Sequence, residues 1–220
     1  MKSFLLAMLL TGLPPQAQHK TELIFPLLGA WHVTNGGSDP ALNGHSKSFG
    51  QEYALDILKV NRHSMKSCES ECKLNKNYYA FGELVIAPAD GFVTDVTAGV
   101  ADNSIVGVRE ELTLGNAVII RHRPGEASLF AHLKNGSIKV CAGQTVKQGQ
   151  IIGLVGNSGN STEPHLHYNL QSSSYLHEAS SIQAWFKRVW VVADNKYIKR
   201  DYYAPSGRDN IYSPKQATSK

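Results

Sequence analysis

Short apolar runs alternate with turn-forming residues over most of this sequence. Runs of this length, bounded by glycine, proline and asparagine, are typical of strands and too short for helices. We therefore expect a mainly β fold with antiparallel sheets. The predicted strands are residues 53–60, 84–87, 92–96, 105–109, 117–121, 128–133, 151–155 and 166–170.

The composition excludes several classes of protein. Of 220 residues, 42% are hydrophobic and 18% are charged, which excludes a disordered chain, a collagen-like repeat and a polytopic membrane protein. The net charge is only +4 and there is no dense basic run, so nucleic acid is not indicated as a partner. Three cysteines cannot supply a four-cysteine zinc site.

The N-terminus has the order of a secretory signal. Lys2 precedes an apolar stretch over residues 4–13, and prolines and Ala17 follow it. The stretch is shorter than the roughly 20 residues that span a bilayer. Residues 1–17 are thus a candidate signal peptide, which predicts export to the periplasm, the cell wall or the medium. The alternative is an N-terminal strand or helix packed on the domain.

Two segments depart from the strand-and-turn pattern. Residues 61–77 are polar and predict a surface insertion, with a short helix over residues 67–75. Cys68 and Cys72 in this insertion either pair or remain thiols, and Cys141 is left over. Apolar pieces within residues 183–212 predict an extra strand pair or edge, followed by a frayed tail.

The residues His165-Leu166-His167 lie within one predicted strand. Side chains two positions apart in a strand point to the same face, about 7 Å apart at the backbone. Both imidazoles would therefore face one cleft, as in a metal site or an acid–base site. Alone the pattern is weak, because two surface histidines on an exposed strand give the same spacing.

Other motifs occur in a fixed order ahead of this pair. They are Gly44-His45, Tyr53-Ala54-Leu55-Asp56, Ala131-His132-Leu133 and the glycine-rich turn Gly153-Leu154-Val155-Gly156-Asn157-Ser158-Gly159. In this combination the sequence resembles the LytM/lysostaphin-type zinc metallopeptidases, peptidase family M23, with the duplicated hybrid motif fold. These enzymes cut the peptides of peptidoglycan. The resemblance covers residues 25–171.

The resemblance implies a fold and a domain layout. The fold would be an antiparallel β-sheet and sandwich-type barrel hybrid with a zinc-bearing groove. The metallopeptidase domain would span residues 23–213, with its core at 25–171 and a flexible tail at 214–220. An extended peptide would lie across Gly156, Asn157, Ser158 and Gly159, whose glycines leave room for a ligand backbone.

The resemblance also assigns roles to five side chains. His45, Asp56 and His167 would bind one Zn²⁺, and His132 and His165 would be catalytic without binding it. Two imidazoles and a carboxylate suit zinc and leave a position open for water, whose pKa falls to about 7. His45 lies further from Asp56 than in many family members. His63 and His32 are therefore its rivals.

These assignments predict a zinc-dependent metalloendopeptidase that hydrolyses peptide cross-links of cell-wall peptidoglycan. Its partner would be the peptidoglycan peptide, with no nucleic acid, no stable membrane insertion and a monomer favoured. One alternative is a catalytically inactive wall-binding or regulatory module of the same fold. Another is a carrier module, which the turn Val146-Lys147-Gln148-Gly149 resembles, although the exposed hairpin of a modified lysine is missing.

Overall fold

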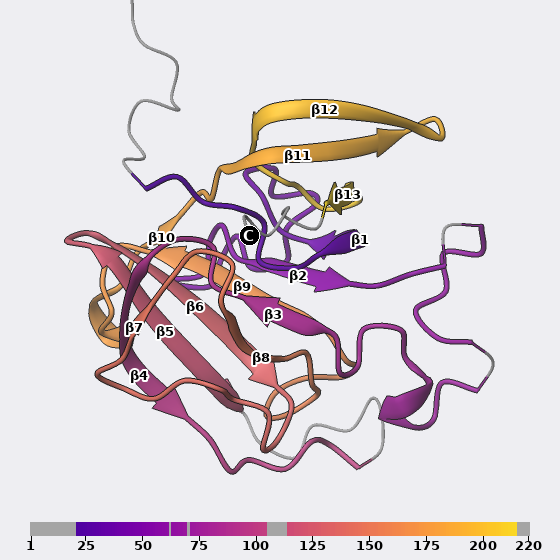
Figure 1. Cartoon of the computed structure of the whole chain (residues 1–220). Coiled ribbons are helices and arrows are strands. Elements are labelled where there is room, and N and C mark those ends of the chain that lie inside the picture. Colours follow the sequence, from indigo (N-terminus) through magenta and orange to yellow (C-terminus); the bar gives the residue numbers. More distant parts are fainter. Residues whose placement is uncertain (1–20, 62, 70, 105–113, 215–220) are drawn as a thin grey trace, which may run out of the picture.

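The computed structural model describes residues 21–61, 63–69, 71–104 and 114–214 (Figure 1). Three predicted segments lie outside the described residues: the candidate signal peptide at 1–17, the strand at 105–109, and the tail at 214–220 except its first residue. The domain limits 23–213 therefore stay a prediction.

The described residues form one large antiparallel sheet and a small one. The large sheet has the order β12-β11-β13-β1-β2-β9-β6-β5-β4-β7, with β10 paired to β9, and the small sheet pairs β3 with β8. The strands are β1 (Gly29–Asn35), β2 (Leu55–Leu58), β3 (Leu84–Ile86), β4 (Gly91–Thr97), β5 (Asn116–Arg123), β6 (Glu126–Leu133), β7 (Thr145–Val146), β8 (Ile151–Leu154), β9 (Leu166–Gln171), β10 (Ser181–Ile182), β11 (Phe186–Ala193), β12 (Lys196–Tyr203) and β13 (Asn210–Ser213). Two 3-10 turns, η2 (Asn75–Asn77) and η3 (Leu176–Glu178), complete the elements.

The fold prediction is confirmed. Every predicted strand within the described residues is present, and every pairing between named strands is antiparallel. The large sheet is open, because its end strands β12 and β7 are not neighbours in the strand order. The predicted extra strand pair is the hairpin of β11 and β12, which extends the sheet beyond β1 (Figure 1).

One core holds the two sheets together. Side chains of the small sheet, such as Val85 and Ile152, share a buried apolar cluster with Phe130 and Tyr168 of the large sheet. The ring centroids of Phe130 and Tyr168 lie 5.4 Å apart, in an edge arrangement that aromatic pairs favour. This core fixes the back of β6 and β9, the strands that present the histidines.

The predicted helix over residues 67–75 is wrong. The described part of the segment forms turns and only the single turn η2 at its end. Cys68 and Cys72 form a disulfide, and Cys68 makes a β-bridge with Tyr78. The bridge pairs Cys68 with another chain segment as in a β-ladder, which a continuous helix over these residues does not allow. No helix in the described residues is long and apolar enough to span a membrane.

Candidate metal centre and active site

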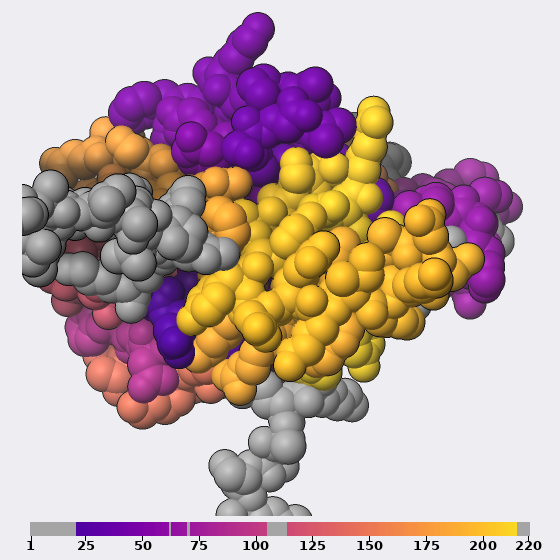
Figure 2. Space-filling view, turned by 90° about the horizontal axis from the view of Figure 1, so that it is seen from above, coloured from indigo at the N-terminus to yellow at the C-terminus, as the bar shows by residue number. Residues whose placement is uncertain are grey.

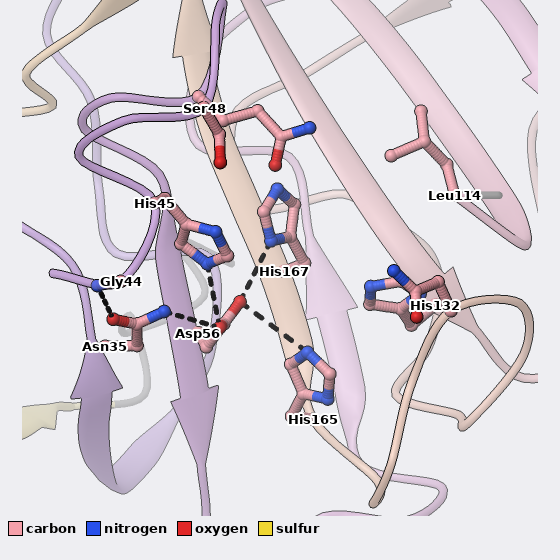
Figure 3. Close-up of a pocket in the computed structure, with 11 residues that line it drawn as sticks. Asn35, Gly44, His45, Ser48, Asp56, Leu114, His132, His165 and His167 are labelled. Atoms are coloured by element: carbon pink, nitrogen blue, oxygen red, sulfur yellow. Dashed lines mark hydrogen bonds and ion pairs between the residues drawn. The ribbon is translucent and has the colours of Figure 1, made fainter. Parts of the chain in front are cut away.

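Three of the predicted site residues converge at the centre of the large sheet. Asp56 on β2 lies directly opposite His167 on β9, and side chains of opposite residues in an antiparallel pair share a face. His167 Nδ1 lies 2.9 Å from Asp56 Oδ1, and His45 Nε2 lies 2.8 Å from Asp56 Oδ2 (Figure 3). One ligand atom from each residue falls within 4.8 Å of the other two.

His45 comes from the loop between β1 and β2, and Asn43 holds this loop in place. The buried Asn43 amide donates to the carbonyl oxygens of Gly37 and Glu52, both at 2.7 Å. Its Oδ1 accepts the backbone N–H of His45 at 2.8 Å. The three bonds fix the loop from both ends, so His45 reaches Asp56 despite the long spacing.

The two rival histidines lie elsewhere. His32 on β1 bonds Asn210 through Nδ1 at 3.0 Å. His63 is exposed in the insertion. Within the described residues, the cluster of possible metal ligands contains His45 and neither rival.

Asn35 is a site residue that the sequence reasoning missed. It lies at the end of β1, opposite Asp56, and its amide donates to Asp56 Oδ2 at 3.1 Å. Its Oδ1 accepts the backbone N–H of Gly44. Asn35 therefore orients the carboxylate and the histidine loop together. Only its place just before Gly36-Gly37, a dipeptide typical of turns, could have drawn attention to it.

The carboxylate of Asp56 is charged in the fold. Burial opposes this charge, but hydrogen bonds from His165, His167 and His45 outweigh burial and hold the pKa of Asp56 well below its usual range. An anionic oxygen and two imidazole nitrogens therefore point at one small volume. Nε2 of His167 is buried with no hydrogen-bond partner among the described residues. This donor set fits a divalent cation.

His165 faces the same carboxylate from one side. Its Nδ1–H donates to the carbonyl oxygen of Glu163 at 2.8 Å, so Nε2 is the nitrogen left to face the site, 3.6 Å from Asp56 Oδ1. Burial opposes the charge of this ring, but the hydrogen bond and the negative charge of Asp56 outweigh it and raise the pKa of His165.

His132 completes the histidine cluster from β6. Its ring centroid lies 4.9 Å from that of His165 and 5.8 Å from that of His167. Nδ1–H donates to the carbonyl oxygen of Ser158 at 2.9 Å, which leaves Nε2 as the second ring nitrogen. Burial and the neighbouring His165 and His167 hold the pKa of His132 well below its usual range. Its φ of 60° is left-handed, a strained conformation that is frequent at functional sites.

These side chains line one open cavity of about 610 Å³, a size typical of ligand pockets. Its walls are Asn35, Gly44, His45, Ser48, Gln51, Asp56, Leu114, His132, Asn160, His165 and His167. The five residues with predicted roles are therefore brought together in a single pocket.

The four residues predicted to contact substrate have a different place. Gly156, Asn157, Ser158 and Gly159 are buried, and only their neighbour Asn160 lines the cavity. A Cβ on Gly156 would lie 2.3 Å from the backbone of Lys134, so close packing explains this glycine. The carbonyl of Ser158 holds His132. Through this carbonyl, the turn positions the ring of His132. Substrate contact by the four residues stays a prediction.

Comparison with known proteins finds similarity to one family of peptidases. The profile of peptidase family M23 matches residues 78–179, which include His132, His165 and His167 and begin after His45 and Asp56. An uncharacterized metalloprotease of Haemophilus influenzae is 44% identical over 89 residues, which cover 40% of this chain and 16% of that protein. The peptidoglycan DD-endopeptidase ShyA of Vibrio cholerae is 44% identical over 69 residues, which cover 31% and 16%.

Among solved structures, a mutant catalytic domain of the prophage-encoded M23 protein EnpA from Enterococcus faecalis aligns with a TM-score of 0.46 and 20% identity. The alignment covers 74% of this chain and 95% of that one. The chain spans less than a fifth of the length of each of the two curated relatives, the Haemophilus influenzae metalloprotease and ShyA. Residues 78–179 of the chain match peptidase family M23, the family that its motifs resemble.

Proposed function

We propose that this protein is a zinc-dependent metalloendopeptidase that hydrolyses peptide cross-links of bacterial peptidoglycan. The observation that carries the proposal is the convergence of His45, Asp56 and His167 beside two further histidines in one open pocket. The names of the M23 relatives, among them a peptidoglycan DD-endopeptidase, support the choice of substrate.

Export fits this role. The candidate signal peptide at residues 1–17 leads to the oxidising side of the membrane, where disulfides persist. The disulfide of Cys68 and Cys72 agrees with that compartment.

In this proposal His45 Nε2, Asp56 and His167 Nδ1 hold the zinc ion. When bound, zinc supplies a Lewis acid that lowers the pKa of water to about 7 and polarises a carbonyl group. Asn35 keeps the carboxylate aimed at the site through its hydrogen bond to Oδ2. Such supporting bonds restrict the ligands to one orientation.

His132 and His165 carry the proton transfers. Each ring donates its Nδ1–H to a backbone carbonyl, so each can present Nε2 to the cavity. His132 is neutral and accepts a proton from the attacking water. His165, close to a carboxylate, donates a hydrogen bond to the oxygen on which negative charge develops. Neither step requires a covalent intermediate with the protein.

The test is digestion of defined wall cross-links by zinc-loaded protein, with the products identified by mass. The proposal predicts cleavage of one type of peptide bond, and a loss of about 10²-fold or more in His132→Ala. His177→Ala is the matched control, because His177 is exposed in η3 and outside the pocket. Zinc-loaded protein that binds the wall but releases no product would contradict the proposal.

A further inference from the structure

The C-terminal hairpin is an addition to the family segment. The family profile ends at residue 179, whereas β11, β12 and β13 cover residues 186–213 and extend the large sheet beyond β1. Figure 1 shows the hairpin of β11 and β12 projecting from the body of the molecule, and Figure 2 shows its outer surface in yellow and orange. This hairpin can therefore have a function of its own, separate from that of the pocket on β2 and β9.

A second cavity lies on this hairpin. It measures about 360 Å³ and is lined by Ile24, Lys187, Arg188, Trp190, Lys199, Ser213 and Pro214. Three of these residues are cationic and none is acidic. The lining alone therefore favours an anion.

The strand register builds one wall of the cavity. Trp190 lies directly opposite Lys199 on β12 and Tyr212 on β13, so the three side chains share a face. The ring centroids of Trp190 and Tyr212 lie 6.2 Å apart, and those of Tyr197 and Tyr212 lie 5.4 Å apart, both in edge arrangements. Lys199 therefore lies on the same face of the sheet as Trp190 and Tyr212.

The local ion pairs leave net positive charge. Lys187 pairs with Glu22, whose other oxygen accepts the Tyr202 hydroxyl at 3.2 Å. Lys199 Nζ lies 3.9 Å from Asp201 Oδ1, but both side chains are largely exposed, and such pairs contribute little. The positive charge at the cavity therefore exceeds what Glu22 and Asp201 offset.

Arg188 gives a second, independent sign of function. It lies within β11, yet its φ is 56°, in the left-handed region that residues other than glycine seldom adopt. Such strain persists only where the surroundings impose it, and it is frequent at ligand sites. Here the strained residue is one of the three cations of the cavity.

We infer that this cavity binds an anionic polymer of sugar or polyol units. Guanidinium and ammonium groups bind phosphate or carboxylate, and the indole ring of Trp190 has a flat apolar face with a polar N–H at its edge. A sugar or polyol unit that carries phosphate or carboxylate matches both features. The site would attach the protein to an acidic polymer, and it does not depend on the proposed hydrolysis.

The experiment uses the full chain without metal, so that its outcome is independent of catalysis. Isothermal titration calorimetry with poly(glycerol phosphate) and with polygalacturonate separates the phosphate source from the carboxylate source, and dextran serves as the uncharged control. Lys199→Glu should weaken binding about tenfold, whereas Lys199→Arg should retain it. Lys196→Glu is the matched control, with the same charge change on an exposed residue of β12 outside the cavity.

Added inorganic phosphate should also shift the NMR signal of the Trp190 indole N–H in the unmodified chain. Equal losses in Lys199→Glu and Lys196→Glu would mean that only the overall charge attracts the polymer, and would overturn the inference. Absence of binding to both acidic polymers would overturn it as well.

Discussion

His132 and His165 are held by the same kind of contact, an Nδ1–H donated to a backbone carbonyl. The carbonyl oxygen can only accept, so the contact fixes the tautomer as well as the orientation of each ring. The proposed metal ligands differ, because His45 and His167 place a ring nitrogen 2.8 Å and 2.9 Å from Asp56, closer than the 3.6 Å of His165 Nε2. Two classes of histidine are therefore distinguished by what each ring bonds.

This difference predicts the behaviour of His165→Ala. The variant should bind zinc with the stoichiometry of the unmodified protein, while turnover falls about 10²- to 10⁴-fold. Atomic absorption after dialysis and cleavage of a defined cross-linked peptide measure the two quantities. If zinc is lost from His165→Ala, the division between the two classes of histidine is wrong.

His122 makes stability depend on pH. Its Nδ1–H donates to the Asp90 carbonyl at 2.9 Å, and its Nε2 accepts from Ser128, whose hydroxyl bonds that of Tyr168. Burial lowers the pKa of His122. The unfolded chain then binds a proton before the folded one does, so the free energy of unfolding falls as the pH drops below about 6.5.

The metal-free His122→Gln variant should therefore show a smaller fall in stability between pH values of about 8 and 5, and about 1 kcal/mol less stability at the higher pH. Urea unfolding at both pH values measures this. A pH dependence equal to that of the unmodified protein would show that His122 does not contribute.

At the scale of single residues, much of the candidate site could be predicted from the sequence. The five motif residues lie in one pocket, where the resemblance placed them. Asn35 and Asn43 were not predicted as site residues, because they act by bonding the backbone of a loop. The path of that loop depends on contacts between distant segments, which no local pattern encodes.

At the scale of elements, the insertion is tied to the active site. Ser67 Oγ donates to Glu163 Oε2 at 2.8 Å, and the backbone carbonyl of Glu163 is the one that holds His165. Ser67 itself is fixed, because its carbonyl accepts the N–H of Tyr79 at 3.1 Å and the disulfide of Cys68 follows it.

Ser67→Ala should therefore lower kcat about tenfold and leave KM and zinc content unchanged, because only the support of His165 is lost. Ser67→Thr keeps the hydroxyl and should retain activity. Ser64→Ala, an exposed change in the same insertion, is the control. If Ser67→Ala and Ser64→Ala give the same kcat, the insertion has no part in positioning.

The predicted strands within the described residues are all present, because each is a short apolar run between turns. The strands β1, β7 and β10 were not predicted. The helix predicted over residues 67–75 was wrong, since the Cys68–Tyr78 bridge overrides local preference. The 3-10 turn η2 occurs where that prediction ends.

At the scale of the whole molecule, the metal site joins segments that are distant in sequence. The His45 loop, β2 and β9 meet at Asp56, which bonds both His45 and His167, and β2 pairs directly with β9. The order of these strands depends on pairings between segments far apart in the sequence, which local patterns do not reveal. The position of β13 between β1 and β11 likewise could not be derived from the sequence.

Because zinc would bind the folded chain across these segments, it should stabilise the whole molecule. Saturation at about 100 times Kd should add about 2.7 kcal/mol and raise the Tm. Asp56→Ala should abolish this increase, and calorimetry with and without zinc measures it. An equal rise in Tm for Asp56→Ala would show that zinc binds elsewhere.

X-ray absorption at the zinc edge, on protein with one equivalent of zinc, measures whether His45, Asp56 and His167 hold one zinc ion. We expect two imidazole nitrogens and a carboxylate oxygen at about 2.0–2.2 Å, with one imidazole lost in His45→Ala. A spectrum with sulfur ligands, or one unchanged in both His45→Ala and His167→Ala, would show that these three residues do not hold the ion.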